Sequence, residues 1–118
     1  MTQTVLYDRK ANPDYIPRVA AVHDLCGYGK CSLGIAIPVV SAGGCDVCPV
    51  PTGLFSSHTA FPGWYMHDTT DILPDYLAAW QNIGVEIDAI YSGFLGAPEQ
   101  VDIIRSLYKR YPDALRVV

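Results

Sequence analysis

The segment HDLCGYGKCSLG, residues 23–34, carries the glycine, lysine and serine residues that surround a bound phosphate in many proteins. A P-loop has the pattern G-x-x-x-x-G-K-S/T, in which backbone amides and the lysine hold the phosphates. Here Asp24 stands at the position of the first glycine, and Cys31 follows the lysine where a hydroxyl residue is required. The dinucleotide pattern G-x-G-x-x-G also fails, because Ser32 replaces its last glycine. The acidic side chain would repel phosphate, so we predict a loop that suits a cationic or hydrogen-bond-donating ligand group.

The four cysteines have a spacing that superficially resembles a zinc site, with Cys26 and Cys31 followed by Cys45 and Cys48. The second pair lies in a predicted strand, where residues three apart point to opposite faces and cannot bind one ion together. A disulfide framework is not expected, because the chain shows no secretion signal. We therefore predict structural or incidental thiols, with metal binding and redox or nucleophilic use as the open alternatives.

The composition is that of one small globular domain. The chain has 118 residues, is 50% hydrophobic and has a net charge of −4. Its basic residues are scattered, which argues against a nucleic-acid-binding surface. No apolar run approaches the roughly 20 residues of a membrane span, and the polar N-terminus does not resemble a signal peptide. We therefore expect a cytoplasmic protein that binds neither nucleic acid nor membrane.

Strand and helix patterns alternate along the chain after a polar leader, residues 1–17, in which two prolines prevent regular structure. The predicted strands are residues 18–23, 45–55 and 114–118, together with a strand that runs into a glycine loop within residues 87–96. The predicted helices are residues 33–44, 72–84 and 97–113. A loop at residues 56–71 has room for a short hairpin. This order predicts an α/β fold with a mostly parallel sheet, in which ligands collect at the carboxyl ends of the strands.

Each predicted helix has an apolar face. The helix at 33–44 is apolar over most of its circumference and has Ser32 as a candidate N-cap, which predicts a buried helix despite the kink expected at Pro38. The other two helices should each bury one stripe. These stripes are Leu73, Leu77, Trp80 and Ile83 in one helix, and Val101, Ile104, Leu107, Tyr108 and Tyr111 in the other.

Residues that could bind a ligand follow three of the predicted strands, so in a parallel sheet they should converge on one edge. They are Asp24 and Gly27 after the first strand, Phe55, His58 and Thr59 after the second, and Ser92, Gly93 and Phe94 after the third. A carboxylate, an imidazole, hydroxyl groups and aromatic faces suit a small flat heteroaromatic ring with polar substituents.

Simpler structural roles remain open for several of these residues. Asp24 could cap a turn, His58 could bond only to nearby backbone, and Trp64 could be a core aromatic residue. His23, at the end of the first predicted strand, is expected to be a buried histidine whose hydrogen bonds are satisfied.

Three blocks of the sequence resemble the N-terminal half of the pyridoxal/pyridoxamine kinases of the ribokinase-like superfamily. These blocks are GYG after the first predicted strand, PVPTGLFSSHTAFPGW after the second and YSGFLGAPEQ after the third. The second block keeps the spacing of the family's F-S-N-H-T-x-Y-x-x-W run, through Phe55, Ser56, His58, Thr59, Phe61 and Trp64. The resemblance covers residues 18–118 and is nearest to the bacterial pyridoxamine kinases. It implies a ribokinase-like three-layer sandwich, of which this chain is the N-terminal half.

The resemblance implies ATP-dependent phosphorylation of the 5′-hydroxymethyl group of a B6 vitamer, in the salvage of pyridoxal 5′-phosphate. Thr59 matches a substrate-contacting threonine, and His58 and Phe55 match residues that line the pocket. Trp64 matches an aromatic residue of the adjoining flap. Phe94 stands where many members have a tyrosine, and Asp24 stands where many have a serine that bonds the ring. We expect the Asp24 carboxylate to favour a protonated amine or pyridinium.

The resemblance also implies ATP, Mg²⁺ and a homodimer for the full-length parent. The family's catalytic aspartate lies in a G-T-G-D motif, and its nucleotide site begins with a D-P-V-x-G-D run. Neither motif is in this sequence, so we expect the catalytic residue beyond Val118 and a chain truncated before the ATP-binding half. On this basis the chain alone should not turn over substrate. Two alternatives stay open, namely a hydroxymethylpyrimidine kinase of the same superfamily and a non-catalytic binding or dimerisation module.

Overall fold

The computed structural model describes residues 13–118. In chain order its elements are β1 (Arg18–Tyr28), α1 (Leu33–Ala42), β2 (Asp46–Ser57), β3 (Met66–Asp68), α2 (Leu73–Asn82), β4 (Ala89–Ser92), α3 (Glu99–Arg110) and β5 (Leu115–Val117). The predicted alternation of strands and helices is confirmed, and β3 supplies the short hairpin that the loop at 56–71 could hold. Of the predicted leader, residues 1–12 lie outside the described residues, and residues 13–17 form neither helix nor strand.

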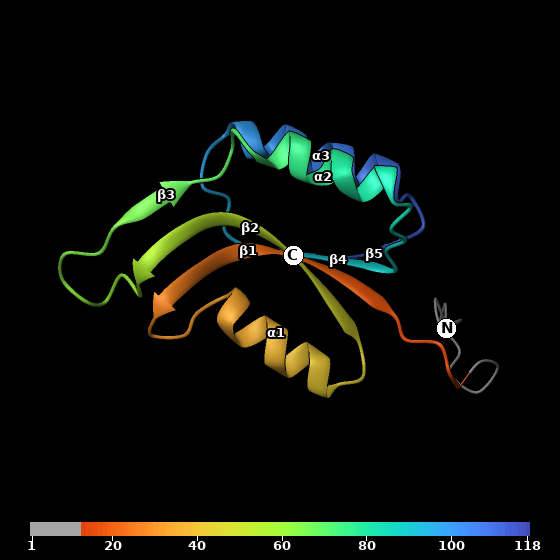
Figure 1. Cartoon of the computed structure of the whole chain (residues 1–118), viewed down its shortest axis with the longest axis horizontal. Coiled ribbons are helices and arrows are strands. Elements are labelled where there is room, and N and C mark those ends of the chain that lie inside the picture. Colours follow the sequence, from red (N-terminus) through yellow and green to blue (C-terminus); the bar gives the residue numbers. More distant parts are fainter. Residues whose placement is uncertain (1–12) are drawn as a thin grey trace, which may run out of the picture.

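The sheet is the middle of three layers. Its strand order is β3-β2-β1-β4-β5, and every neighbouring pair is parallel except β2 and β3. Helices α2 and α3 lie together on one face of the sheet, and α1 lies on the other (Figure 1). This arrangement confirms the predicted α/β fold with a mostly parallel sheet. It also brings the carboxyl ends of β1, β2 and β4 to one edge.

The main core fills the space between the sheet and helices α2 and α3. Its buried side chains alternate along the strands and recur at helical spacing along the helices. They are Ala20, Val22, Val50 and Ile90 from the strands, Leu73, Leu77, Ile104 and Leu107 from the helices, and Ile87 just before β4. Trp80 and Tyr111 pack against this cluster, as predicted.

Two residues predicted to belong to the helical stripes are exposed instead. Ile83 is 79% exposed because α2 ends before it, at a turn in which Gly84 has a φ of 71°. Val101 is 41% exposed because the buried stripe of α3 runs through Gln100, Ile104 and Leu107. These three follow the i, i+4, i+7 spacing of one helix face, and Val101 lies beside that face.

Helix α1 is only partly buried, so the prediction of a buried helix at 33–44 is wrong for its outer side. Leu33 and Ala36 face the sheet, whereas Ile35 is 49% exposed and Val39 is 63% exposed. Apolar residues all round a helix predict burial only if structure lies on both sides of it. Among the described residues, the sheet alone packs against α1 (Figure 1).

Strands β1 and β2 extend farther than predicted, so Asp24 and Gly27 lie within β1 and do not follow it. Phe55, the last residue of the second predicted strand, lies inside β2, which continues to Ser57. The ladder continues to the pair Tyr28–Ser57, with an irregularity between His23 and Leu25. Gly27 allows this extension, because a Cβ there would lie 2.9 Å from the Ser56 oxygen. The extended pair brings the predicted site residues to the end of the ladder.

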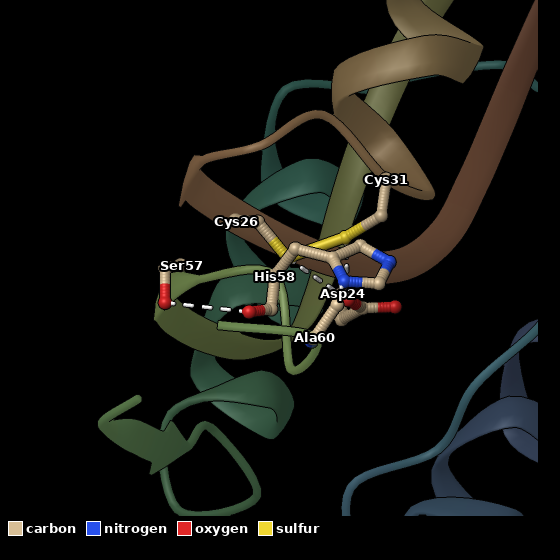
Figure 2. Close-up of a disulfide and its surroundings, with 6 residues drawn as sticks. All are labelled: Asp24, Cys26, Cys31, Ser57, His58 and Ala60. Carbon is tan, nitrogen blue, oxygen red and sulfur yellow. Dashed lines mark hydrogen bonds between the residues drawn. A yellow bond between two sulfur atoms is a disulfide. The ribbon is translucent and has the colours of Figure 1, made fainter. Parts of the chain in front are cut away.

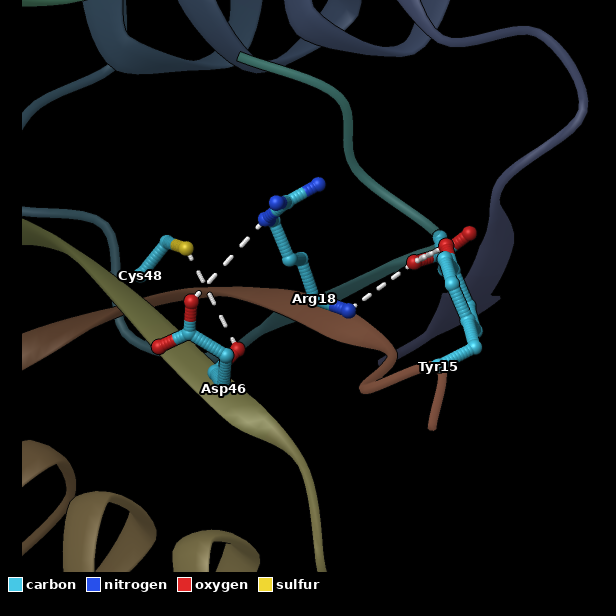
Figure 3. A network of polar contacts seen from close by, with 5 residues as sticks. Tyr15, Arg18, Asp46 and Cys48 are labelled. Carbon is cyan, nitrogen blue, oxygen red and sulfur yellow. Dashed lines mark hydrogen bonds and ion pairs between the residues drawn. The ribbon is translucent and has the colours of Figure 1, made fainter. Parts of the chain in front are cut away.

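The chain before β1 is fixed to the opposite, amino end of the sheet (Figure 3). Tyr15 donates its hydroxyl to Asp88 Oδ2 at 2.5 Å, and the Arg18 amide donates to the same oxygen at 2.9 Å. The hydrogen bond to the carboxylate raises the pKa of Tyr15 to about 12. Arg18 also lies 3.9 Å from Asp46, at the start of β2. These contacts anchor the entry to β1 far from the predicted site.

Candidate functional site

Three aromatic rings meet at the carboxyl edge of the sheet. The Phe55 ring, near the end of β2, lies 5.6 Å from the Trp64 ring and 6.0 Å from the Phe94 ring, between centroids. Trp64 comes from the loop before β3, and Phe94 from the loop after β4. Phe55 is half-buried, while the other two rings are 46% and 47% exposed. The structure therefore brings these three predicted residues together and leaves part of their surface open to a ligand.

Backbone and hydroxyl contacts fix two of these rings. Thr52 is fully buried in β2 and donates its hydroxyl to the Phe94 oxygen at 2.7 Å. The Ser56 amide donates to the Tyr65 oxygen at 2.8 Å, and the Ser56 hydroxyl accepts from the Tyr65 amide at 2.7 Å. The loop that carries Trp64 is thus tied to β2 next to Phe55. Hydrogen bonds as well as packing therefore position the aromatic rings at this edge of the sheet.

A buried glutamine, which the sequence analysis did not identify, joins four segments behind the aromatic rings. Gln100 Nε2 donates to the Thr52 oxygen at 2.8 Å and lies 3.2 Å from Asp68 Oδ1 and from Thr70 Oγ1. Its Oε1 accepts from the Gly96 amide at 2.7 Å. The side chain is 0% exposed, so its donors and acceptor need these partners. The sequence indicates the burial of Gln100 through its position four residues before Ile104, on the same face of the helix.

Asp68 takes part in the same network. It accepts from the Thr70 amide at 2.8 Å and from the Thr70 hydroxyl at 2.5 Å. These bonds, with a smaller contribution from Gln100, lower the pKa of the Asp68 carboxyl. The Asp68 carboxylate at the end of β3 therefore helps to hold the hairpin of β2 and β3 beside the aromatic rings.

Asp24 is buried in β1, with an exposed fraction of 8%, and faces two cysteines (Figure 2). Its Oδ2 lies 3.7 Å from Cys26 Sγ and 3.5 Å from Cys31 Sγ. The two sulfur atoms form a disulfide, so the expectation that the cysteines are unpaired is wrong for this pair. The expectation rested on the missing secretion signal. The sequence does not show that the chain between β1 and α1 brings the Cα atoms of Cys26 and Cys31 to 6.3 Å, a distance that a disulfide can span.

The four cysteines do not form one metal site. Cys45 and Cys48 are free thiols around the start of β2, whereas the disulfide lies near the carboxyl end of β1. Burial raises the pKa of the Cys48 thiol, and the Asp46 carboxylate adds to this shift. The two pairs therefore lie at opposite ends of the sheet, and that Cys45 and Cys48 cannot together bind one ion stays a prediction.

His58 and Thr59 lie in the turn that follows β2. His58 Nδ1 accepts from the Ala60 amide at 2.9 Å (Figure 2). The His58 amide donates to the Tyr28 oxygen at 2.8 Å. The predicted alternative of a backbone partner is therefore realised for this imidazole. Thr59 is exposed. The ring of Phe61 packs on that of Tyr28, at 5.2 Å between centroids, and so holds the turn against β1.

His23 is buried, as predicted, but its Nε2 atom has no hydrogen-bond partner among the described residues. The imidazole packs edge-on against Tyr91, with ring centroids 4.3 Å apart. Burial lowers the pKa of this imidazole, and the neighbouring Asp24 charge opposes that shift. The side chain also lines a cavity of about 360 Å³ beside α1. The prediction that its hydrogen bonds are satisfied is therefore wrong for Nε2.

The amides in the first turn of α1, which follows the glycine-rich loop, bond within the chain. The Gly34 amide donates to the Cys31 oxygen at 2.9 Å, and the next two amides donate to the Ser32 oxygen. These amides are therefore unavailable to an anion, and the Asp24 carboxylate lies nearby. Ser32 precedes α1 as predicted, but its side chain makes no capping bond. That the loop is not a P-loop stays a prediction, which rests on Asp24 and Cys31 at two positions of the P-loop pattern.

The comparisons with solved structures agree with the fold described above. A protein named a phosphomethylpyrimidine kinase, from Bacteroides thetaiotaomicron and crystallised with pyridoxal, is 43% identical to this chain with a TM-score of 0.82. The match covers 86% of this chain and 36% of that protein. Pyridoxal kinase from Lactobacillus plantarum is 28% identical with a TM-score of 0.78, over 82% of this chain and 35% of that one.

A third neighbour is similar in fold alone. Pyridoxal kinase from Leishmania donovani, in a complex with ADP and ginkgotoxin, is 14% identical with a TM-score of 0.75, over 84% of this chain and 38% of that one. No protein-family model matches the chain, and no curated protein matches it. Among the described residues, no helix has the length and apolar character needed to cross a membrane.

The chain therefore has the ribokinase-like α/β fold, and its structural neighbours are kinases. It is similar to a pyridoxal kinase and to the phosphomethylpyrimidine kinase, which confirms the resemblance indicated by the sequence. The chain spans about a third of the length of these neighbours.

Proposed function

We propose that this chain forms the vitamin-binding part of a kinase that transfers phosphate from ATP to the 5′-hydroxymethyl group of a B6 vitamer, in the salvage of pyridoxal 5′-phosphate. The observation that carries the proposal is the group of three half-open aromatic rings, Phe55, Trp64 and Phe94, at the carboxyl edge of the sheet. Flat heteroaromatic rings bind between such side chains by stacking and edge contacts. The similarity to a protein crystallised with pyridoxal supports the proposal.

The proposal gives each predicted site residue a role. The three aromatic rings contact the pyridine ring, and Thr59 and His58, on the turn after β2, contact the edge of the vitamer. Asp24 attracts a protonated amine or the pyridinium nitrogen. A ratio of pyridoxamine to pyridoxal turnover that stays the same in the kinase carrying Asp24→Ser would contradict the role of Asp24.

The remaining parts of the activity are proposed for a longer protein. The catalytic aspartate and the residues for ATP and Mg²⁺ lie outside this chain, and the kinase is a cytoplasmic homodimer. The chain of 118 residues should therefore bind a vitamer without phosphorylating it.

Isothermal titration calorimetry of the chain with pyridoxamine and pyridoxine tests the proposal, because these vitamers lack the aldehyde that would react with lysines. We expect Phe55→Ala to weaken binding by about tenfold, which corresponds to the loss of a ring contact worth about 1.4 kcal/mol. Ile83→Ala is the matched control, since Ile83 is 79% exposed at the end of α2 and should leave the affinity unchanged. Equal binding by wild type and Phe55→Ala would contradict the proposal.

The phosphomethylpyrimidine kinase among the neighbours supports a second candidate, a hydroxymethylpyrimidine kinase. Its substrate is also a flat ring with a hydroxymethyl arm. Titration with 4-amino-5-hydroxymethyl-2-methylpyrimidine separates the two, because tighter binding of the pyrimidine than of both vitamers would favour this candidate. Absence of binding by all three compounds would favour the non-catalytic module.

A further inference from the structure

Three possible metal ligands meet where β1 approaches the start of α1. The Asp24 carboxylate and the sulfur atoms of Cys26 and Cys31 lie within 4.8 Å of one another (Figure 2). The distances from Oδ2 to the two sulfurs are 3.7 and 3.5 Å. In a tetrahedral zinc site with ordinary Zn–S and Zn–O bond lengths, a sulfur and an oxygen ligand are about 3.5 to 3.7 Å apart. The carboxylate therefore already lies at ligand distance from both sulfurs.

The path of the backbone explains why Cys26 and Cys31, together with Asp24, are placed to bind one metal ion. Asp24 and Cys26 are two residues apart in β1, so their side chains leave the strand on the same side. The chain then turns through Gly29, which has a φ of 74°, and returns Cys31 with its Cα 6.3 Å from that of Cys26. Cys45 and Cys48 have the shorter spacing, but they form no such group with a third ligand among the described residues.

The disulfide offers the Asp24 carboxylate no hydrogen-bond donor. The carboxylate is 8% exposed, and the two sulfur atoms are its only polar contacts among residues 13–118. A disulfide has no S–H group to donate, so it leaves the buried carboxylate without a partner for its charge. Buried charges are normally paired or bound to a metal. A bound cation would satisfy the carboxylate directly.

We propose that Asp24, Cys26 and Cys31 form a binding site for a soft divalent metal ion such as Zn²⁺ when the disulfide is reduced. Two thiolates and one carboxylate are a normal ligand set for zinc, with the fourth position left to water. The metal site shares Asp24 with the vitamer site proposed above, but metal binding does not depend on the kinase activity.

Reduction of the disulfide has to precede binding of the metal ion. A small-molecule dithiol reduces the Cys26–Cys31 bond, becoming a disulfide itself, and two thiols form in the protein. Binding of the metal then displaces one proton from each thiol, while Asp24 binds as the carboxylate. The sulfur atoms must separate to about 3.8 Å, the edge expected between two sulfur ligands of zinc. The turn between β1 and α1 has to absorb this movement.

The test uses the 118-residue chain, kept reduced with a phosphine that does not bind the metal. Zn²⁺ is titrated against a chromophoric chelator, and Co²⁺ absorption reports thiolate bonding and tetrahedral geometry. We expect one metal ion per chain for the wild type. The double variant Cys26→Ser/Cys31→Ser should lose it, and Asp24→Asn should weaken binding by at least about tenfold, as loss of even a supporting contact does.

The double variant Cys45→Ser/Cys48→Ser is the matched control, because it removes two thiols from the other end of the sheet and should retain one ion per chain. Circular dichroism of each variant verifies that it is folded. The proposal is overturned if the fully reduced wild type binds no ion at micromolar Zn²⁺. It is also overturned if the Cys26/Cys31 variant, folded, binds as well as the control. Neither readout requires vitamer binding, so failure here is distinct from failure of the proposed function.

Discussion

The two faces of the sheet are built differently. Helices α2 and α3 lie side by side on one face and enclose a core that includes Leu73, Ile90 and Leu107, none of them more than 1% exposed. The other face carries α1 alone. There, Val39 is 63% exposed, and an apolar cavity of about 390 Å³ is lined by side chains of β1, α1, β4 and β5.

The difference shows that an apolar helix is not buried by its composition. Helix α1 is the most apolar of the three helices, yet only Leu33 and Ala36 are buried in it. Helix α3 is far more polar, yet it buries Gln100, Ile104 and Leu107. Burial depends on how many elements pack against a helix, and α3 has both α2 and the sheet beside it.

The largest effect on stability should come from the face of the sheet that α2 and α3 cover. Leu107→Ala should lower the free energy of unfolding by about 2–5 kcal/mol, because it leaves a cavity in a packed core. Ile104→Val is a milder variant and should lower it by about 0.5–1.5 kcal/mol. Urea denaturation followed by circular dichroism measures both. A cost below about 0.5 kcal/mol for Leu107→Ala, typical of a surface position, would contradict the assignment of this face as the core.

A smaller effect is expected where β4 passes His23. A Cβ at Gly93 would overlap with the Nδ1 and Cε1 atoms of the His23 ring. Gly93→Ala should therefore lower the free energy of unfolding by about 1–3 kcal/mol, the usual cost of overpacking.

The double variant His23→Ala/Gly93→Ala supplies the control for this overlap. It should be less unstable than the sum of the two single variants, because removal of the ring makes room for the methyl group. Purely additive costs in urea denaturation would show that the two positions do not interact.

On the face that carries α1, His23 should make the stability of the protein depend on pH. Burial lowers the pKa of the folded imidazole below its ordinary value of 6.5, so the unfolded chain binds a proton more readily. The stabilising effect of a neutral His23 is present above about pH 6.5 and is lost as the pH falls toward the folded pKa. We expect the decrease in stability between about pH 7 and pH 5 to be smaller in His23→Gln than in wild type. Parallel pH profiles would contradict this assignment.

The smallest effect should come from the outer side of α1. Val39→Lys should change the free energy of unfolding by less than about 0.5 kcal/mol, as at other exposed positions. Denaturation and size-exclusion chromatography of the 118-residue chain measure stability and association together. A cost above about 1 kcal/mol, or a lower apparent mass than wild type, would mean that another copy covers this face in solution.

Local patterns in the sequence predict the framework well. The alternation of strands and helices, the parallel sheet and the meeting of Phe55 with Phe94 all follow from periodicity and from the geometry of parallel strands. The extension of β1 through Asp24 and Gly27 was missed, because polar residues and glycine normally end a strand.

Contacts between distant segments were not predictable in the same way. Gln100 bonds to the oxygen of Thr52, 48 residues away in sequence, and only the folded chain brings the two together. The Cys26–Cys31 disulfide likewise depends on the path of the turn before α1. The sequence located the edge of the sheet where the candidate site lies, but not the hydrogen bonds that hold it.

The contact between His23 and Gly93 also constrains how this sequence can diverge. A side chain at position 93 costs less in a chain that has already lost the imidazole at position 23, because the ring and a Cβ would otherwise occupy the same space. A smaller residue at position 23 leaves a cavity but makes no clash with the glycine. Among related chains, we therefore expect residues larger than glycine at position 93 to accompany a small residue at position 23.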